Sequence, residues 1–254
     1  HRFRFVGRER GYHGMNIGCV SVGGMINNVK TFASILMPGV QHMRHTHLPE
    51  HKFVSGQPET GVELAEDLER ICMNFGAENI AACIVEPIAG STGTLVPPKG
   101  YLQRLREICD KHGILLIFDE VITGWGRTGS PFASQEYGVT PDMMTMAKAT
   151  TNGISPMGVV ACKEDIYDAI AENAPKGTIE LFHGYTYSGI PISVAAGLAV
   201  QDIIEKDDIF NRAKNLSPYF QEGLMSLKDI DVVDNIRGYG MMGGIDMVMD
   251  KKPG

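Results

Sequence analysis

Two continuous apolar runs separated by a helical pattern constrain this chain more than any other feature. The runs cover Ile80–Val85 and Ile114–Phe118, and an acidic residue follows each of them directly. Between the runs, apolar side chains recur every three to four residues from Leu102 to Cys109, and Gly113 ends the pattern. Apolar runs without polar alternation are typical of strands that are buried on both faces. We therefore predict a right-handed βαβ unit within a parallel sheet.

Further elements continue this alternation on both sides of the unit. A helical pattern over residues 64–75 precedes the first run, and residues 157–162 form a third strand candidate. Strands that alternate with helices in this way predict an α/β fold with a mostly parallel sheet.

The alternation of strand and helix patterns ends near residue 193. A helix pattern rich in Ala and Gly covers residues 194–204, and a polar helix pattern follows over residues 208–226. A strand-turn-strand pattern then covers residues 232–248. We place a domain boundary at about residue 205, with a large domain at residues 1–204 and the start of a small C-terminal α/β domain at residues 205–254.

Charge and apolar patterning exclude several classes of protein. Lys and Arg number 23 and Asp and Glu number 30, so the net charge of −7 disfavours nucleic acid as a partner. The longest apolar run, residues 194–200, is far shorter than the roughly 18 residues of a membrane span. Five widely spaced cysteines favour reduced thiols and a cytoplasmic protein. The chain begins at His1 without an initiator Met, and we interpret it as a piece of a longer protein.

Charged side chains follow the predicted strands where a parallel sheet binds ligands. Glu86 comes after the first strand and Asp119 after the second. A carboxylate at this edge can bind a metal ion or a protonated nitrogen, or it can accept hydrogen bonds from loop amides. Lys148 follows small and apolar residues, where a poorly solvated ammonium group favours the neutral, nucleophilic amine. Read alone, however, the same segment favours a solvated surface lysine.

Several blocks of the sequence, taken together, resemble one known family. Residues 114–129, with Asp119-Glu120, Gly124 and a downstream Ala147-Lys148, resemble the signature of the class III pyridoxal-phosphate aminotransferases. Three further blocks resemble this family in the right order, and these are Arg10–Gly14, Val85–Pro87 and His183–Gly189. The resemblance spans residues 8–200 and is strongest to the branch that transfers amino groups from ω-amino acids such as β-alanine to pyruvate.

The resemblance implies a fold, a cofactor and a reaction. The fold would be the large domain of the aspartate-aminotransferase-like fold, and the cofactor would be pyridoxal 5′-phosphate. Lys148 would hold the cofactor as a Schiff base and later move the substrate proton. Asp119 would keep the pyridine nitrogen protonated so that the ring can accept electrons. The partners would be a small amino donor and a keto acid, which react in two half-reactions.

The resemblance also assigns supporting roles around the cofactor. His13 would hold Asp119 in place, Tyr12 would stack on one face of the ring, and Val121 would press on the other. Glu86 would lie near the hydroxyl side of the ring.

One further role would cross a subunit boundary. Thr186 resembles a threonine that reaches the cofactor phosphate of a neighbouring subunit, which implies a homodimer or a tetramer of dimers. The chain departs from the family at Ile190, where a histidine is common. The family blocks that carry the main phosphate loop and the substrate-binding arginine are absent from these residues.

Two other motifs indicate competing functions. Four histidines within ten residues could bind zinc in a hydrolase, and these are His42, His45, His47 and His51. Neither an HExxH spacing nor a cysteine accompanies them, so we predict no metal site. Residues 238–243 match GxGxxG, but a strand pattern follows where a dinucleotide site needs a helix.

Two alternatives also remain within the family resemblance. One is a different class III enzyme that acts on γ-aminobutyrate, ornithine or glutamate semialdehyde. Ile122 disfavours those branches that carry glutamine at its position. The other is a non-catalytic relative that keeps the fold, which the presence of Asp119 and Lys148 disfavours.

Overall fold

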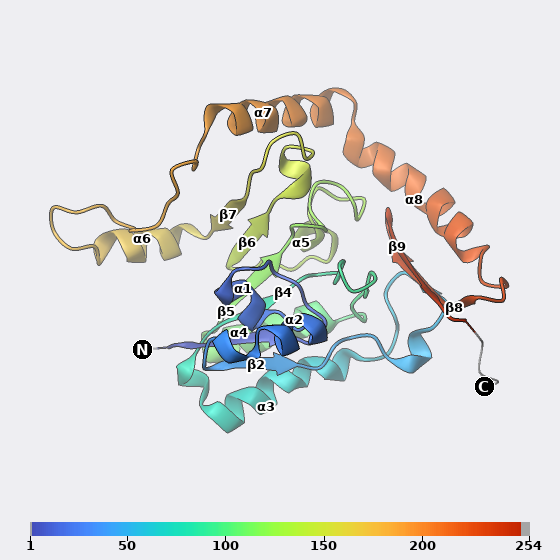
Figure 1. The fold of residues 1–254 in the computed structure, drawn as a ribbon, viewed down its shortest axis with the longest axis horizontal. Helices are drawn as coiled ribbons and strands as arrows, with labels where there is room; N and C mark the ends of the chain where they lie inside the picture. The colour runs from blue at the N-terminus through green and yellow to red at the C-terminus, as the bar shows by residue number, and fades with distance from the viewer. Residues whose placement is uncertain (1, 250–254) are drawn as a thin grey trace.

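A six-stranded sheet forms the centre of the computed structural model, which describes residues 2–249 (Figure 1). Its strand order is β2-β1-β4-β5-β6-β7, and only β7 runs antiparallel to its neighbour. The strands are β1 (Arg4–Arg8), β2 (Val40–Met43), β4 (Ile80–Val85), β5 (Leu115–Asp119), β6 (Met143–Met146) and β7 (Val159–Cys162).

The predicted βαβ unit is confirmed. Strands β4 and β5 pair in parallel, with Ala82 opposite Leu115, and α4 (Tyr101–His112) connects them. The α/β class and the mostly parallel sheet are therefore as predicted. Strands β1, β2 and β6 were not predicted, because arginine, histidine or threonine side chains interrupt their short apolar patterns.

The two faces of the sheet have different surroundings. Strand side chains alternate between faces, so Cys83 and Phe118 point into a core beneath α4 and α3 (Glu66–Phe75). Ile117 and Asp119 point to the opposite face. Because α3 and α4 cover only the first face, the second face is left available for a binding site.

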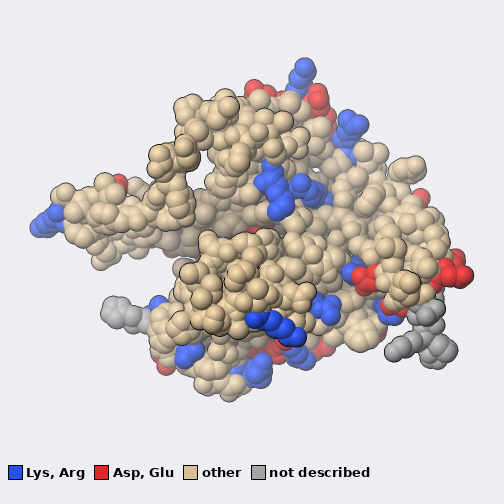
Figure 2. All heavy atoms as spheres, in the orientation of Figure 1, with Lys and Arg blue, Asp and Glu red and all other residues tan. Residues whose placement is uncertain are grey.

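An arch of helices runs over the open side of the sheet (Figure 1). It consists of α6 (Glu164–Glu172), α7 (Pro191–Lys206) and α8 (Ile209–Met225). Figure 2 shows that the molecule is hollowed beneath the arch. Shorter helices complete the fold, namely α1 (Ile17–Val22), α2 (Ile26–Thr31) and α5 (Ala133–Glu136). No helix among residues 2–249 is long and apolar enough to cross a membrane.

A second, three-stranded sheet lies at the C-terminal side. It consists of β3 (Val54–Ser55), β8 (Val233–Tyr239) and β9 (Met242–Met247). The GxGxxG segment forms the hairpin between β8 and β9, as its strand pattern predicted, and Gly240 takes the positive φ of 59° that the turn needs. Strand β3 precedes the boundary that we place near residue 205, so this sheet joins segments from both sides of it. The division into two domains stays a prediction, and residues 1 and 250–254 lie outside the described chain.

The hairpin is attached to the rest of the molecule by polar contacts. Arg237 forms a two-pronged ion pair with Asp246, at 2.6 and 2.8 Å, and its Nε donates to the Gly93 carbonyl at 2.6 Å. The Asn235 side-chain amide donates to Nε2 of His47 at 3.2 Å. Burial and the nearby Arg237 lower the pKa of His47 to about 4. His47 is therefore a neutral acceptor in the folded protein.

We predict that His47 makes the protein less stable in acid. Its pKa is about 6.5 when unfolded and about 4 when folded, so the unfolded chain binds more protons between these values. Stability should therefore fall as the pH drops from 6.5 to 4, by on the order of 1–2 kcal/mol from this residue. Urea unfolding at several pH values should show a shallower loss for H47Q, which cannot titrate. H183Q is the control, because it replaces an exposed histidine. An equal loss of stability with falling pH in H47Q and wild type would contradict the prediction.

Candidate active site

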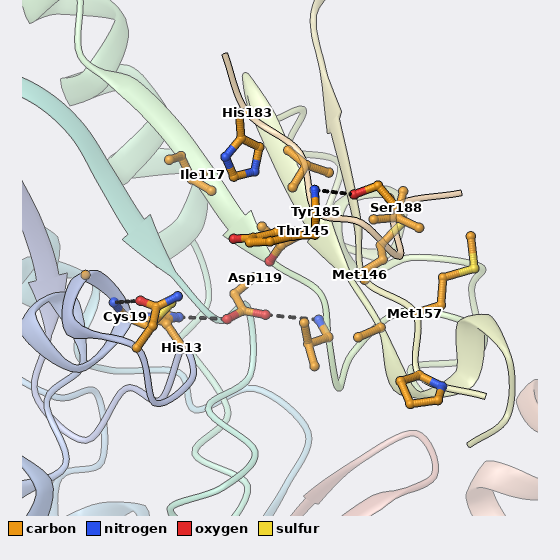
Figure 3. A pocket seen from close by; sticks show the side chains of 18 of the residues that line it. His13, Cys19, Ile117, Asp119, Thr145, Met146, Met157, His183, Tyr185 and Ser188 are labelled. Atoms are coloured by element: carbon orange, nitrogen blue, oxygen red, sulfur yellow. Dashed lines mark hydrogen bonds and ion pairs between the residues drawn. The ribbon is translucent and has the colours of Figure 1, made fainter. Parts of the chain in front are cut away.

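A cavity of about 860 Å³ lies on the open face of the sheet, at the carboxyl ends of its parallel strands (Figure 3). The sheet contributes Ile84, Ile117 and Asp119 to its wall, and the loop after β1 contributes His13. The segment before α7 closes it from the other side with His183 and other residues. The cavity therefore lies where the sequence predicted that strand ends would gather functional side chains.

Asp119 is a buried carboxylate held from two directions. Asp119 is 5% exposed, and its Oδ2 lies 2.7 Å from Nδ1 of His13 (Figure 3). Its Oδ1 accepts a hydrogen bond from the Val121 backbone at 3.0 Å. The His13 side chain is only 2% exposed, so this contact is shielded from water. The structure thus brings together His13, Asp119 and Val121 as the resemblance implies, while their roles toward a cofactor stay predictions.

The loop that carries His13 is fixed by close backbone packing. Gly24 exchanges two hydrogen bonds with this loop, to Arg10 and Gly11, each at 2.8 Å. A Cβ atom at Gly24 would lie 2.2 Å from the Arg8 carbonyl oxygen, so only glycine allows this approach. The position of His13 is therefore set by the backbone before any ligand binds.

Glu86 is buried but is turned toward loop amides. Its two carboxylate oxygens accept from the backbone N–H groups of Tyr12 and Gly90, each at 2.9 Å. The buried Arg8 donates to the Glu86 carbonyl at 2.7 Å. Burial raises the pKa of Glu86 above its ordinary value, and the two amide bonds oppose this rise. Neither Glu86 nor Tyr12 lines the cavity, so their predicted contacts with a cofactor ring stay predictions.

Glu120 follows Asp119 and organises the loop beyond it. It is fully buried, and its carboxylate accepts from the hydroxyl of Thr123 at 2.7 Å. It also accepts from the backbone of Ala133 and Ser134, at 2.8 and 2.7 Å. Burial is the main cause that raises the pKa of Glu120. Successive acidic residues thus differ in role, because one faces the cavity and the next holds the loop.

Lys148 begins a short turn directly after β6. Its neighbour Ala147 lines the cavity, whereas the Lys148 side chain is exposed. Its exposure in the described chain does not match the expectation of a poorly solvated ammonium group and agrees with the alternative of a solvated lysine. Thr186 is also exposed, and it lies between Tyr185 and Tyr187, which both line the cavity. The structure therefore places Lys148 at the rim of the cavity rather than within it.

Three of the four clustered histidines bind separate partners. His42 contacts the Gly23 carbonyl at 2.8 Å, and His51 contacts the Thr60 hydroxyl at 3.3 Å. His47 instead binds the hairpin, as described above. Within residues 2–249, no three His, Cys, Asp or Glu side chains are grouped so that they could hold a metal ion.

Several cavity residues were not found from the sequence. They come from α1 and its N-terminal end, from β6 and from the segment before α7, and they include Asn16, Cys19, Thr145, His183 and Tyr185. Burial is the main cause that raises the pKa of the Cys19 thiol. Two signals were available: α1 follows the Tyr12-His13 motif by only a few residues, and His183 and Tyr185 lie in a block that resembles the family.

The cavity fits the pyridoxal phosphate that the resemblance implies. A pyridine ring needs an apolar slot and an anion beside its protonated nitrogen. Asp119 provides a shielded anion held by His13, and Val121 provides an apolar wall next to it. The residues that would hold the ring are therefore Asp119 and Val121, with Lys148 at the rim.

We predict that E120Q destabilises the protein by about 2–3 kcal/mol. The amide would place an NH₂ donor against backbone N–H donors that now meet a carboxylate. Urea unfolding of E120Q should be compared with that of E107Q, since Glu107 is 64% exposed and bonds only at the surface. E107Q should leave stability unchanged within error. An E120Q variant as stable as wild type would show that Glu120 does not hold this loop.

Comparison with known proteins identifies close relatives. The sequence matches the family model for class III aminotransferases over residues 1–253. An omega-aminotransferase of Caulobacter vibrioides is 54% identical over 99% of this chain and 56% of that protein. A beta-alanine–pyruvate aminotransferase of Pseudomonas aeruginosa is 48% identical over 96% of this chain and 54% of that protein.

Solved structures agree with the sequence matches. The crystal structure of an (S)-enantioselective omega-transaminase from Thermomicrobium roseum superposes with a TM-score of 0.89 at 35% identity. The match covers 98% of this chain and 55% of that one. This chain therefore spans a little over half the length of the relatives that it matches.

Proposed function

This chain belongs to the class III aminotransferases, and from that premise we propose that it carries the reactive centre of a pyridoxal-phosphate transaminase. The reaction would move an amino group from an ω-amino acid such as β-alanine to pyruvate. The observation that carries the proposal is the shielded His13–Asp119 pair in the cavity wall, one strand away from Lys148. The relatives whose names include beta-alanine and pyruvate support the choice of substrates.

Asp119 would control the electronics of the reaction. When bound, pyridoxal phosphate supplies an aromatic ring that takes up the electrons released at the substrate carbon. The Asp119 carboxylate would hold the proton on the ring nitrogen through a short, charge-assisted hydrogen bond. His13 would keep the carboxylate aimed at that nitrogen, and the Val121 side chain would keep the ring flat against its wall.

Lys148 would perform the proton transfer. Its Nζ would hold the cofactor covalently between turnovers and would be released when the substrate amine arrives. The free amine would then act as the base that takes the proton from the substrate carbon and as the acid that later gives it back. Glu86 would support this arrangement indirectly, because it fixes the backbone of Tyr12 beside His13.

We further propose that the working form is a homodimer or a tetramer of dimers. The segment before α7 and α7 itself expose large apolar side chains, including Phe182, Tyr185, Ile192 and Leu198. Exposed large apolar side chains in such number are typical of an interface between subunits. Thr186 lies within this surface and would reach the phosphate of the neighbouring site. The five free cysteines support a reducing, cytoplasmic location.

We predict that D119N keeps its cofactor but loses about a thousandfold in rate, equivalent to ~4 kcal/mol of transition-state stabilisation. An amide cannot hold the ring proton as a carboxylate does. K148A should lose both the visible absorbance of the bound cofactor and the reaction. The measurement is the single half-reaction, in which each amino donor is mixed with the loaded protein and the loss of visible absorbance is timed.

Two outcomes would contradict this proposal in different ways. Normal rates in D119N would remove the role of Asp119, and the exposed Asp110 provides a control substitution, D110N. Faster reaction with ornithine or γ-aminobutyrate than with β-alanine would assign the protein to another branch of the family. That second result would leave the mechanism intact.

We predict that two inactive variants restore activity when their subunits are mixed. In a dimer, K148A and T186V subunits would combine to form one intact site, with Lys148 from one chain and Thr186 from the other. Unfolding and refolding the mixture should recover about a quarter of the wild-type sites. Each variant refolded alone is the control. If mixed dimers of K148A and T186V subunits form but recover no activity, Thr186 does not serve the neighbouring site.

A further inference from the structure

The backbone of Lys148 takes a conformation that its neighbours must hold. Its φ is 46°, in the left-handed region that side-chain-bearing residues seldom adopt. Such a conformation is costly and persists only where surrounding contacts fix it. The contacts around residues 147–151 therefore fix the backbone position from which the Lys148 side chain extends.

The Thr150 hydroxyl fixes this turn from within. Its Oγ1 donates to the Ala147 carbonyl at 3.0 Å, and the Thr150 backbone N–H donates to the same carbonyl at 3.0 Å. Thr150 is buried, so its hydroxyl has little access to water. The hydroxyl oxygen accepts one hydrogen bond from outside the turn, from the indole Nε1 of Trp125 at 3.0 Å.

Trp125 comes from the loop that begins at Asp119, and this loop is itself fixed. The Trp125 backbone N–H donates to the Pro131 carbonyl at 2.6 Å. The Trp125 and Phe132 rings pack edge to face, with their centroids 5.2 Å apart. Trp125 is also left-handed, with a φ of 65°. Two costly backbone conformations, at Trp125 and Lys148, are thus linked by one side-chain hydrogen bond through Thr150.

We propose that Trp125 is a positioning residue for Lys148. Its indole N–H fixes the Thr150 hydroxyl, which fixes the turn, so the Lys148 amine and the Asp119 carboxylate are held by one connected loop system. This inference rests on the proposed function, in which Lys148 binds pyridoxal phosphate. The structure offers a simpler role for Trp125, the packing of its ring on Phe132, and substitutions can separate the two roles.

The experiment follows the uptake of pyridoxal phosphate by the apoprotein. The rate is read from the growth of visible absorbance, so it does not depend on catalytic turnover. W125F keeps the aromatic ring and removes the N–H, T150V removes the hydroxyl, and T150S keeps the hydroxyl. We expect W125F to slow uptake roughly three- to tenfold, as the loss of one hydrogen bond would. T150S should match wild type, and T150V should be slowed at least as much as W125F.

The double variant W125F/T150V decides between the two roles. If the hydrogen bond carries the effect, W125F slows uptake in the presence of Thr150 and adds nothing to T150V. If ring packing alone matters, uptake by W125F will equal that of wild type, and the proposal is overturned. Equal slowing by W125F with and without the Thr150 hydroxyl would overturn it as well. Melting temperatures of all variants check that each is folded.

Failure of the proposed function gives a different result. In that case the wild-type protein itself takes up no pyridoxal phosphate at Lys148, and K148A behaves as wild type does. Normal wild-type uptake together with unaffected W125F uptake would instead remove only the inference about Trp125.

Discussion

The hydrogen bond between His13 and Asp119 is the interaction on which the rest of the site depends. It joins the loop after β1 to the end of β5, strands that β4 separates in the sheet. A parallel sheet makes this possible because all its parallel strands deliver their following residues to one edge. Both side chains are nearly buried, so under the proposed function the Asp119 carboxylate would act on a bound ring at close range rather than through solvent.

Three buried acids near this edge show how orientation separates structural from chemical roles. The carboxylate oxygens of Glu86 and Glu120 accept hydrogen bonds from loop donors, mostly backbone amides. Burial raises the pKa of each carboxyl group. Asp119 keeps one oxygen for His13 and lies on the cavity wall. The first two acids hold the loops rigid, so that the third is presented in a fixed direction. This division of labour supports the assignment of Asp119 as the group that meets the cofactor.

The sequence predicted the parts of the fold whose signals are local. Strands β4 and β5 are apolar on both faces, and their class and connection follow from that pattern alone. Strand β6 was not recognised, because Thr145 breaks its short run. The family and the link between His13 and Asp119 came from resemblance, and the relatives confirm the family. Trp125 and Thr150 are 25 residues apart in the sequence, and their hydrogen bond links the left-handed turns at Trp125 and Lys148. Hydrophobic periodicity carries no information about such a long-range contact.

The central claim is that Lys148 binds the cofactor beside Asp119, and peptide mapping tests it most directly. The protein loaded with pyridoxal phosphate is reduced with borohydride, digested, and analysed by mass spectrometry for the lysine that carries the pyridoxyl group. We expect one modified peptide, with the group on Lys148. A pyridoxyl group on any other lysine, or no modified peptide at all, would contradict it.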